Sequence, residues 1–396
     1  MMQISPETQL FIREHSSDDV RVLALQAKKY PDIDMPTAIT QIAGRKVAAE
    51  KIPSWWEIEK IWYPKHLSLE QCSSEITARY KARLLQGDSL TDLTGGFGID
   101  CSFLATGFKS TTYVERQEEL CEIAAHNFPV LSLNHINIKN EDGVTYLQAM
   151  SPVDCLFLDP ARRNEHGGKT VAISDCEPNV AELEELLLQK ANRVMIKLSP
   201  MLDLSLALKE LKQTQEVHIL SVNNECKELL ILLGQTSPAE ISIHCVNLFT
   251  KGTQKEQHFV FTREQEQCSE CTYTDSLETY LYEPNASLLK AGAFRSIAAA
   301  YPVRKLHPNS HLYTSDTFIE NFPGRIFRIV NQCSFNKKEV KENLADLKKA
   351  NVTVRNFPAT VAELRKRIHL AEGGDTYLFA STLNNGQKVL IRCEKV

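Results

Sequence analysis

From residue 89 onward, short apolar segments alternate with amphipathic ones, and this alternation constrains the possible folds more than any other feature of the chain. Segments 89–93, 111–115, 135–140, 153–159 and 192–200 have the length and composition of strands, and each precedes a segment with helical spacing of apolar residues. Repeated strand–helix units predict a parallel sheet with helices on both faces. Two further strands, 216–222 and 228–234, have no helix between them, which predicts an antiparallel pair at an edge of the sheet.

The regions before and after the alternating segments have different patterns of apolar residues. Residues 1–66 show apolar residues at three- and four-residue spacing, interrupted by prolines, which predicts short helices. Segment 67–85 predicts one helix that opens the α/β domain, and this domain extends to residue 265. Residues 266–330 and 331–396 predict a small α+β module in two parts, ending in a hairpin around Asn384-Asn385-Gly386. The three tryptophans crowd into residues 55–62, where packing between two domains is the expected use.

Composition indicates the cellular compartment of the protein and whether it binds a membrane or a metal. No apolar run approaches the roughly 20 residues of a membrane span, and the first residues lack the basic and apolar regions of a secretory signal. The 11 cysteines are odd in number and scattered. We therefore expect a cytoplasmic protein with reduced thiols, no membrane association and no metal. Cys268-x-x-Cys271 is half of a zinc site without a second pair at suitable spacing, which favours structural thiols.

The charges are distributed unevenly along the chain. Residues 285–396 hold 18 Lys and Arg against 9 Asp and Glu, whereas residues 1–284 hold 27 against 41. A basic segment on an acidic body is the pattern of a module that touches a polyanion such as RNA. A solvated basic face without a partner is the alternative.

A glycine-rich loop follows the first strand of the alternating region. The strand ends at Asp92, and the loop contains Thr94, Gly95, Gly96 and Gly98. Glycines at the carboxyl edge of a parallel sheet let the backbone approach a ligand closely. A dinucleotide fingerprint would need a glycine at position 101, where Cys101 stands, and the Gly-Lys-Ser/Thr of a phosphate-binding loop is absent.

Acidic residues follow the next two strands. Glu115 ends the second strand, where a carboxylate can accept bonds from both ribose hydroxyls, and Asp142 follows the third, where it can accept from an adenine amino group. With no basic phosphate ligand nearby, these acids suit an uncharged adenosine that carries a cationic sulfonium. For each acid alone, a helix cap or loop carboxylate is the alternative.

Two segments carry a resemblance to a known superfamily. Residues 94–100 (TGGFGID) and Asp159-Pro160-Ala161-Arg162 resemble motifs I and IV of the class I S-adenosylmethionine-dependent methyltransferases. The resemblance implies that Asp92 and loop 94–98 hold the methionine part of S-adenosylmethionine, Glu115 the ribose and Asp142 the adenine. It also implies a Rossmann-like sheet with an antiparallel edge strand.

More narrowly, the whole chain is similar to a bacterial methyltransferase family. The segments EQCSSEITARYKA, FLDPARR, IKLSPMLDL, SVNNECKELL and EPNASLLKAGAF carry this similarity. It implies a helical N-terminal region and a C-terminal module with a THUMP-like part, expected at 266–330, and a ferredoxin-like part, expected at 331–396.

The segment after the fourth strand is the expected reaction centre. Asp159 and the backbone around Pro160 can accept hydrogens from an exocyclic amine, which localises the nitrogen lone pair toward the methyl donor. Ala161 and Arg162 stand where related enzymes have proline and an aromatic ring, so Arg162 and Arg163 would stack through the guanidinium plane or hold a phosphate; surface ion pairing is the alternative.

Two other residues are open candidates near the reaction centre. Lys197 could contact the acceptor or the cofactor, or only cap the edge of the sheet, and Cys226 is the one cysteine to consider as a nucleophile. The sequence therefore favours an S-adenosylmethionine-dependent methyltransferase that modifies a base in RNA. A methyltransferase for a small molecule or a protein, or a non-catalytic RNA-binding factor on the same scaffold, are the alternatives.

Overall fold

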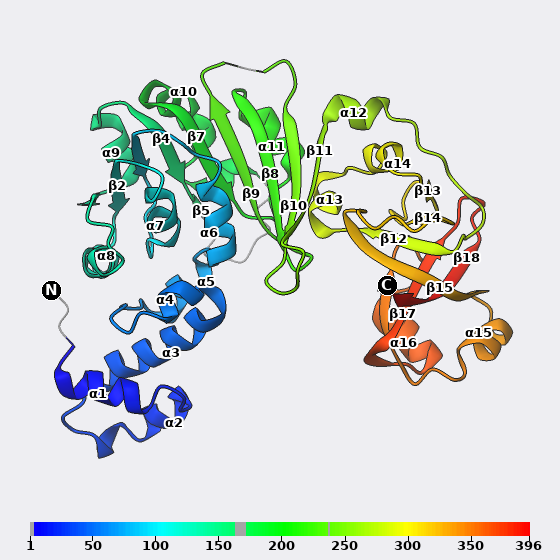
Figure 1. Cartoon of the computed structure of the whole chain (residues 1–396), viewed down its shortest axis with the longest axis horizontal. Helices are drawn as coiled ribbons and strands as arrows, with labels where there is room; N and C mark the ends of the chain where they lie inside the picture. The colour runs from blue at the N-terminus through cyan, green and yellow to red at the C-terminus, as the bar shows by residue number, and fades with distance from the viewer. Residues whose placement is uncertain (1–3, 163–171, 237) are drawn as a thin grey trace. The chain divides into compact units, whose positions relative to one another are not determined.

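The computed structural model (Figure 1) describes residues 4–162, 172–236 and 238–396. The chain divides into two compact units. The first unit comprises residues 1–215 and 229–238, and the second comprises residues 216–228 and 239–396. Among the helices formed by these described residues, none is both long enough and apolar enough to cross a bilayer. All eleven cysteines are free thiols.

Short helices begin the first unit, as the proline-interrupted pattern of residues 1–66 predicts. They are α1 (Pro6–Glu14), α2 (Val20–Leu25), the 3-10 helix η1 (Ala27–Lys29), α3 (Met35–Lys51) and α4 (Pro53–Trp56). Pro6, Pro36 and Pro53 stand in the first turns of α1, α3 and α4, where the missing N–H group has no helical partner to lose. The helices share a small core made of Phe11, Leu23, Met35, Ala38 and Ile42.

Two of the three tryptophans join this helical region to the α/β part of the unit. Trp55 is 2% exposed and packs edge-on against the ring of Phe97, with 5.2 Å between ring centroids. The ring of Trp62 stacks on that of His126, with 3.7 Å between ring centroids, and its backbone N–H and C=O bond to the side-chain amide of Asn127, both at 2.9 Å. Trp56, in contrast, is 43% exposed. The expected packing role therefore fits Trp55 and Trp62 but not Trp56.

The single helix predicted for residues 67–85 is wrong: the segment forms α5 (His66–Gln71) and α6 (Glu75–Ala82). The break falls at Ser73, whose hydroxyl donates to Asp100 Oδ2 at 2.7 Å and accepts from Lys81 Nζ at 3.0 Å. Serine side chains that bond outside a helix favour its interruption, and Ser74 then begins α6 as its N-cap.

A nine-stranded sheet has the order β11-β10-β8-β9-β7-β4-β1-β2-β3, and the division between the units runs through β8 and β9. In the first unit, five strands pair in parallel: β1 (Ser89–Asp92), β2 (Ser110–Glu115), β3 (Ile136–Asn140), β4 (Val153–Leu158) and β7 (Ala191–Leu198). The intervening elements are α7 (Ile99–Ala105), α8 (Glu118–Val130), α9 (Gly143–Ala149), the short strands β5 (Ala161–Arg162) and β6 (Cys176–Glu177), η2 (Ile173–Asp175) and α10 (Val180–Lys190), with α11 (Leu204–Glu210) after β7. The predicted α/β architecture is confirmed.

The antiparallel strands differ in place from the prediction. β8 (Thr214–Val222) and β9 (Glu225–Gly234) are joined by Asn223 and Asn224, both with positive φ, which suits a tight hairpin turn. β9 runs antiparallel to β7 and stands between β7 and β8 in the sheet order, so it is an interior strand. In the second unit, β10 (Ser242–Leu248) pairs in parallel with β8, and β11 (Glu256–Thr262) supplies the antiparallel edge strand.

A second sheet of seven strands occupies the rest of the second unit. Its order is β13 (Arg304–Lys305), β14 (Tyr313–Ser315), β12 (Tyr280–Pro284), β15 (Gly324–Ser334), β18 (Lys388–Lys395), β17 (Ala371–Thr382) and β16 (Lys349–Val354). The helices of this part are α12 (Arg263–Cys268), α13 (Ala286–Ala291), α14 (Ser296–Ala300), α15 (Lys337–Leu344) and α16 (Val361–Ile368). β15 continues through residue 330, so the expected boundary at 330 falls inside a strand. The predicted hairpin is present as β17 and β18.

The bonds between Asn127 and Trp62 give a first prediction. Replacing Asn127, which is 1% exposed, by alanine leaves a backbone N–H and a C=O group without their partner, so we expect a loss of about 2–4 kcal/mol in the free energy of unfolding. Denaturant unfolding followed by circular dichroism measures the loss. Asn134→Ala, at an exposed position, serves as the control and should change the stability by less than about 0.5 kcal/mol. Equal stability of the two variants would contradict the anchoring role.

Candidate active site

The glycine loop between β1 and α7 owes its shape to three different glycines. A Cβ atom on Gly95 would lie 2.2 Å from the ring of Tyr113, so the close approach of this ring excludes any side chain. Gly96 and Gly98 have φ angles of +54° and +85°, which L-residues rarely adopt. A Cβ atom on Gly96 would meet only the Thr94 carbonyl oxygen, at 3.7 Å. The protein therefore leaves space beside the loop at Gly96.

Glu115, at the end of β2, is bonded directly to this loop. One carboxylate oxygen accepts from the backbone N–H of Gly96 at 2.9 Å, and the other accepts from that of Gln117 at 2.8 Å. The side chain of Asn140, at the end of β3, donates to the Glu115 carbonyl at 2.9 Å. The ends of β2 and β3 are thereby joined to each other and to the loop.

Asp92, at the end of β1, is a buried carboxylate beside the loop. It is 1% exposed, and its Oδ1 accepts from the Thr94 N–H at 2.9 Å. Burial raises the pKa of Asp92 to about 8, and the nearby carboxylates of Asp100, Asp159 and Glu115 act in the same direction. Asp92 is thus mostly protonated at neutral pH.

The segment after β4 is hydrogen-bonded to Thr94, the first residue of the loop. The backbone N–H of Asp159 donates to the Thr94 hydroxyl at 2.6 Å, and Pro160 is buried. Arg162 contributes its backbone to β5, where it is paired with Cys176 of β6. Arg163 lies outside the described residues. The segment that begins at Asp159 and the glycine loop are therefore held together by the hydroxyl of Thr94.

A buried network of charges supports Asp159. Lys197 Nζ lies 2.5 Å from Asp159 Oδ2 and 3.3 Å from Asp100 Oδ2, and the fully buried Lys81 lies 3.0 Å from Asp100 Oδ1. Burial alone would raise the pKa of Asp100, but Lys81, Lys197 and the bond from Ser73 outweigh it and lower the pKa to about 2. Asp100 is therefore a carboxylate that bridges two lysines, and Lys197 connects it to Asp159.

Sequence reasoning missed three members of this network: Ser73, Lys81 and Asp100. Asp100 closes the quoted loop motif, and its place in the first turn of an otherwise fully buried helix was an available signal. Lys81 lies three residues after Ala78 and four after Thr77, on the buried face of α6. A lysine on the apolar side of an amphipathic helix requires a buried counter-charge.

The candidates Asp142 and Cys226 lie outside this hydrogen-bonded group. Asp142 is exposed and accepts from the N–H groups of Val144 and Thr145, each at 3.0 Å, which are the contacts of a helix N-cap on α9. Cys226 belongs to the second unit, and burial raises the pKa of its thiol to about 11, so the reactive thiolate is scarce at neutral pH. Hydrogen bonds connect the loop at residues 94–98 to Asp92, Glu115 and Asp159. The side chain of Asp142 makes its bonds to Val144 and Thr145 and not to this group.

Comparison with known proteins places the chain in a family. A model for a ferredoxin-like domain matches residues 280–323, and a model for a THUMP-like domain matches residues 324–395. The two matches occur in this order along the chain, whereas the sequence analysis expected the THUMP-like part first. The crystal structure of a candidate methyltransferase from Porphyromonas gingivalis W83 is similar over 100% of both chains, with 34% sequence identity and a TM-score of 0.88. No curated protein matches the chain.

Other solved structures resemble only part of the chain. An rRNA methylase from Streptococcus thermophilus is 15% identical, with a TM-score of 0.30, over 40% of this chain and 93% of its own. A candidate methyltransferase from Streptococcus mutans, in complex with SAH, is 12% identical, with the same TM-score, over 40% of this chain and 96% of its own. Similarity at this level supports no argument about the reaction.

The full-length match shows what class of protein this is. The strand order and the glycine loop are those of the class I methyltransferase fold, and the match to the P. gingivalis protein covers every element of the chain. The chain belongs to the family of that protein, in which a helical region precedes the methyltransferase fold and ferredoxin-like and THUMP-like segments follow it.

The raised pKa of Asp92 gives a prediction for stability. Because the folded pKa of about 8 exceeds the ordinary value of 3.8, the folded state binds an extra proton between these values. The stability of the wild type should therefore fall as pH rises from about 4 to about 8, by at most about 1.4 kcal/mol per pH unit from this group. Asp92→Asn, which keeps an acceptor for the Thr94 N–H, should lack this fall.

Denaturant unfolding of both proteins at several pH values within the window measures the difference. Subtracting the two curves removes the pH dependence of every other group, including Asp100. Two curves that stay parallel across the window would show that Asp92 is ionised in the folded protein.

Proposed function

We propose that this protein is an S-adenosylmethionine-dependent methyltransferase that modifies a base in RNA. One observation carries the proposal: the strands on either side of β1 lead to Glu115 and Asp159, and both residues are hydrogen-bonded to the same glycine loop. The Glu115 carboxylate accepts from Gly96, and the Asp159 backbone N–H donates to Thr94. The loop, an acid for the sugar and an acid for the acceptor thus form one connected site at the carboxyl edge of a parallel sheet, where such folds bind ligands.

The residues of the site suit S-adenosylmethionine. When bound, this cofactor supplies a methyl group on a positively charged sulfur atom. Glu115 would accept from the ribose hydroxyls, and loop 94–98 would carry the methionine part beside the space at Gly96. Asp92 would face the positively charged part of the cofactor, and a nearby cation would lower its pKa again. Asp142 would accept from the adenine amino group.

Asp159 is the residue that we assign to the methyl acceptor. Its side chain is 37% exposed, whereas the side chain of its partner Lys197 is only 10% exposed, so the carboxylate is the member of the pair that a substrate can reach. Lys197 and Asp100 would hold this carboxylate in one orientation while it accepts hydrogens from the reacting amine. We include Pro160 and Arg162 because they continue the same motif: the Pro160 region would supply a backbone acceptor, and Arg162 a guanidinium for the base or phosphate.

RNA is the acceptor that the C-terminal part favours. THUMP domains are RNA-binding modules, and the THUMP-like match covers residues 324–395. This stretch holds 14 Lys and Arg against 7 Asp and Glu. Basic side chains on α15 and α16 are exposed, among them Lys337, Lys338, Lys341, Lys366 and Arg367. An exposed excess of positive charge favours binding of phosphate groups, with the salt dependence that this entails.

Cofactor binding gives a prediction for Glu115. Glu115→Ala removes the ribose acceptors and the bond to Gly96, so we expect the affinity for S-adenosylmethionine to fall about 100-fold, since bonds to charged groups contribute about 1.5–3 kcal/mol each. Isothermal titration calorimetry measures the affinity. The control is Glu118→Ala, three residues away and exposed, which should bind as the wild type does. An unchanged affinity in Glu115→Ala would remove Glu115 from the cofactor site.

Methyl transfer is tested with labelled cofactor. Incubation of S-adenosylmethionine, labelled on the methyl group, with RNA, protein and metabolite fractions of a strain that lacks the protein should label the RNA fraction. Asp159→Ala should bind the cofactor but transfer methyl groups at least about 100-fold more slowly. Label in the protein or metabolite fraction would replace RNA as the acceptor, and full turnover by Asp159→Ala would refute its role.

A further inference from the structure

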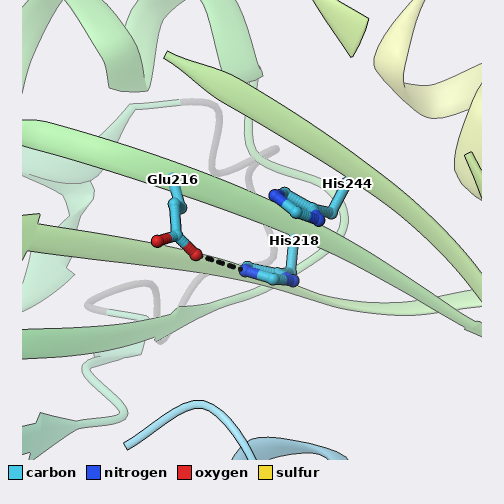
Figure 2. Close-up of side chains that lie close together, drawn as sticks. All are labelled: Glu216, His218 and His244. Atoms are coloured by element: carbon cyan, nitrogen blue, oxygen red, sulfur yellow. Dashed lines mark hydrogen bonds and ion pairs between the residues drawn. The ribbon is translucent and has the colours of Figure 1, made fainter. Parts of the chain in front are cut away.

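Three side chains of metal-binding type meet on one face of the sheet in the second unit (Figure 2). Glu216 and His218 lie two residues apart on β8, so they point to the same face. His244, on β10, is paired directly with His218 in the parallel register. The three residues therefore come together through strand pairing, and their places follow from the register of two neighbouring strands.

The distances within this cluster are those of ligands around a small cation. One ligand atom from each of Glu216, His218 and His244 can be chosen so that all lie within 4.8 Å of one another. His218 Nε2 and Glu216 Oε2 are 3.2 Å apart. Two ligands of a tetrahedral zinc ion, each about 2.0 Å from the metal, are separated by about 3.3 Å. Small side-chain rotations would bring the third ligand to the same separation.

A third histidine extends the cluster onto the edge strand. His258, on β11, places its Nε2 3.1 Å from Nδ1 of His244. The other nitrogen of His244 lies 3.1 Å from the hydroxyl of Ser242. Metal-bound histidines commonly use their second nitrogen in such a bond, which fixes the ring. His258 is exposed, so a fourth ligand can approach from the solvent side of the cluster.

The chemistry of the side chains suits a metal. His218 and His244 each carry an imidazole ring, the commonest metal ligand in proteins. Glu216 adds the single carboxylate, so two histidines and a glutamate would offer one negative charge to a divalent cation.

We propose that Glu216, His218 and His244 bind one zinc ion, with His258 as the fourth ligand. Imidazole nitrogens with one carboxylate oxygen form a donor set that zinc accepts readily. The four ligands would come from three adjacent strands, so the ion would fasten β8, β10 and β11 together within the second unit. The sequence alone predicts no metal, and Cys268 and Cys271 are the zinc ligands that its spacing brings into question. Neither cysteine belongs to the cluster that the described residues form.

Metal binding to the full-length protein without a histidine tag tests this proposal. After removal of metals with a chelator, zinc should bind with one ion per chain in competition with a chromophoric chelator. Cobalt(II) as a probe should give the intense visible absorption of a tetrahedral site, without the charge-transfer bands of thiolate ligands. His244→Gln and Glu216→Gln should each weaken zinc binding by more than about tenfold, because even loss of a supporting partner costs this much.

Matched variants separate this site from others. His135→Gln, an exposed histidine of the first unit, and Cys271→Ser should bind zinc as the wild type does. Absence of zinc binding, or equal binding by the wild type and His244→Gln, would overturn the proposal, and loss of binding in Cys271→Ser would move the site to the cysteines. Because the readout is metal binding alone, neither result depends on the activity proposed above.

Discussion

The carboxylate of Asp100 holds the candidate active site of the first unit together. It bridges Lys81, on α6, and Lys197, at the end of β7, and both lysines are almost completely removed from solvent. Burial of a charge costs several kcal/mol unless a partner of opposite sign compensates it. Without Asp100, the fully buried Lys81 would lose this carboxylate, and Lys197 would keep only that of Asp159 as an ion-pair partner among these two acids. The same carboxylate lies in the first turn of α7, so the glycine loop that precedes this helix is positioned by the network as well.

Much of this arrangement follows from the sequence because parallel strands end at one edge. The largely apolar strand 153–158 and its neighbours predict the sheet, and the residues at the ends of these strands, Asp92, Glu115 and Asp159, are consequently brought to one side. What the sequence did not reveal is how the side chains are partnered. Lys197 has two open interpretations in the sequence, and Lys81 is not singled out there, because its partner Asp100 lies 19 residues further along the chain.

Partners distant in the sequence also explain where the observed strands and helices differ from the predicted ones. The hairpin of β8 and β9 was recognised from the missing helix, but which strand β9 would pair with depends on the length and twist of the whole sheet. Local spacing also favoured one helix across Ser73, since the bonds that interrupt it reach Asp100, 27 residues away. Glu216, His218, His244 and His258 carry little signal individually, and only the register of β8, β10 and β11 makes them neighbours.

The contact of Trp55 with Phe97 has a consequence for how this protein can be divided. Phe97 belongs to the glycine loop, and its ring shares a core with Trp55, Ile52 and Ile61 of the preceding region. A fragment that starts at the first residues of the α/β part would expose this aromatic ring to water and lose one wall of its packing. The N-terminal helices thus form part of the packing that supports the loop. Exchanging them for the helices of a relative would require a matching change at position 97.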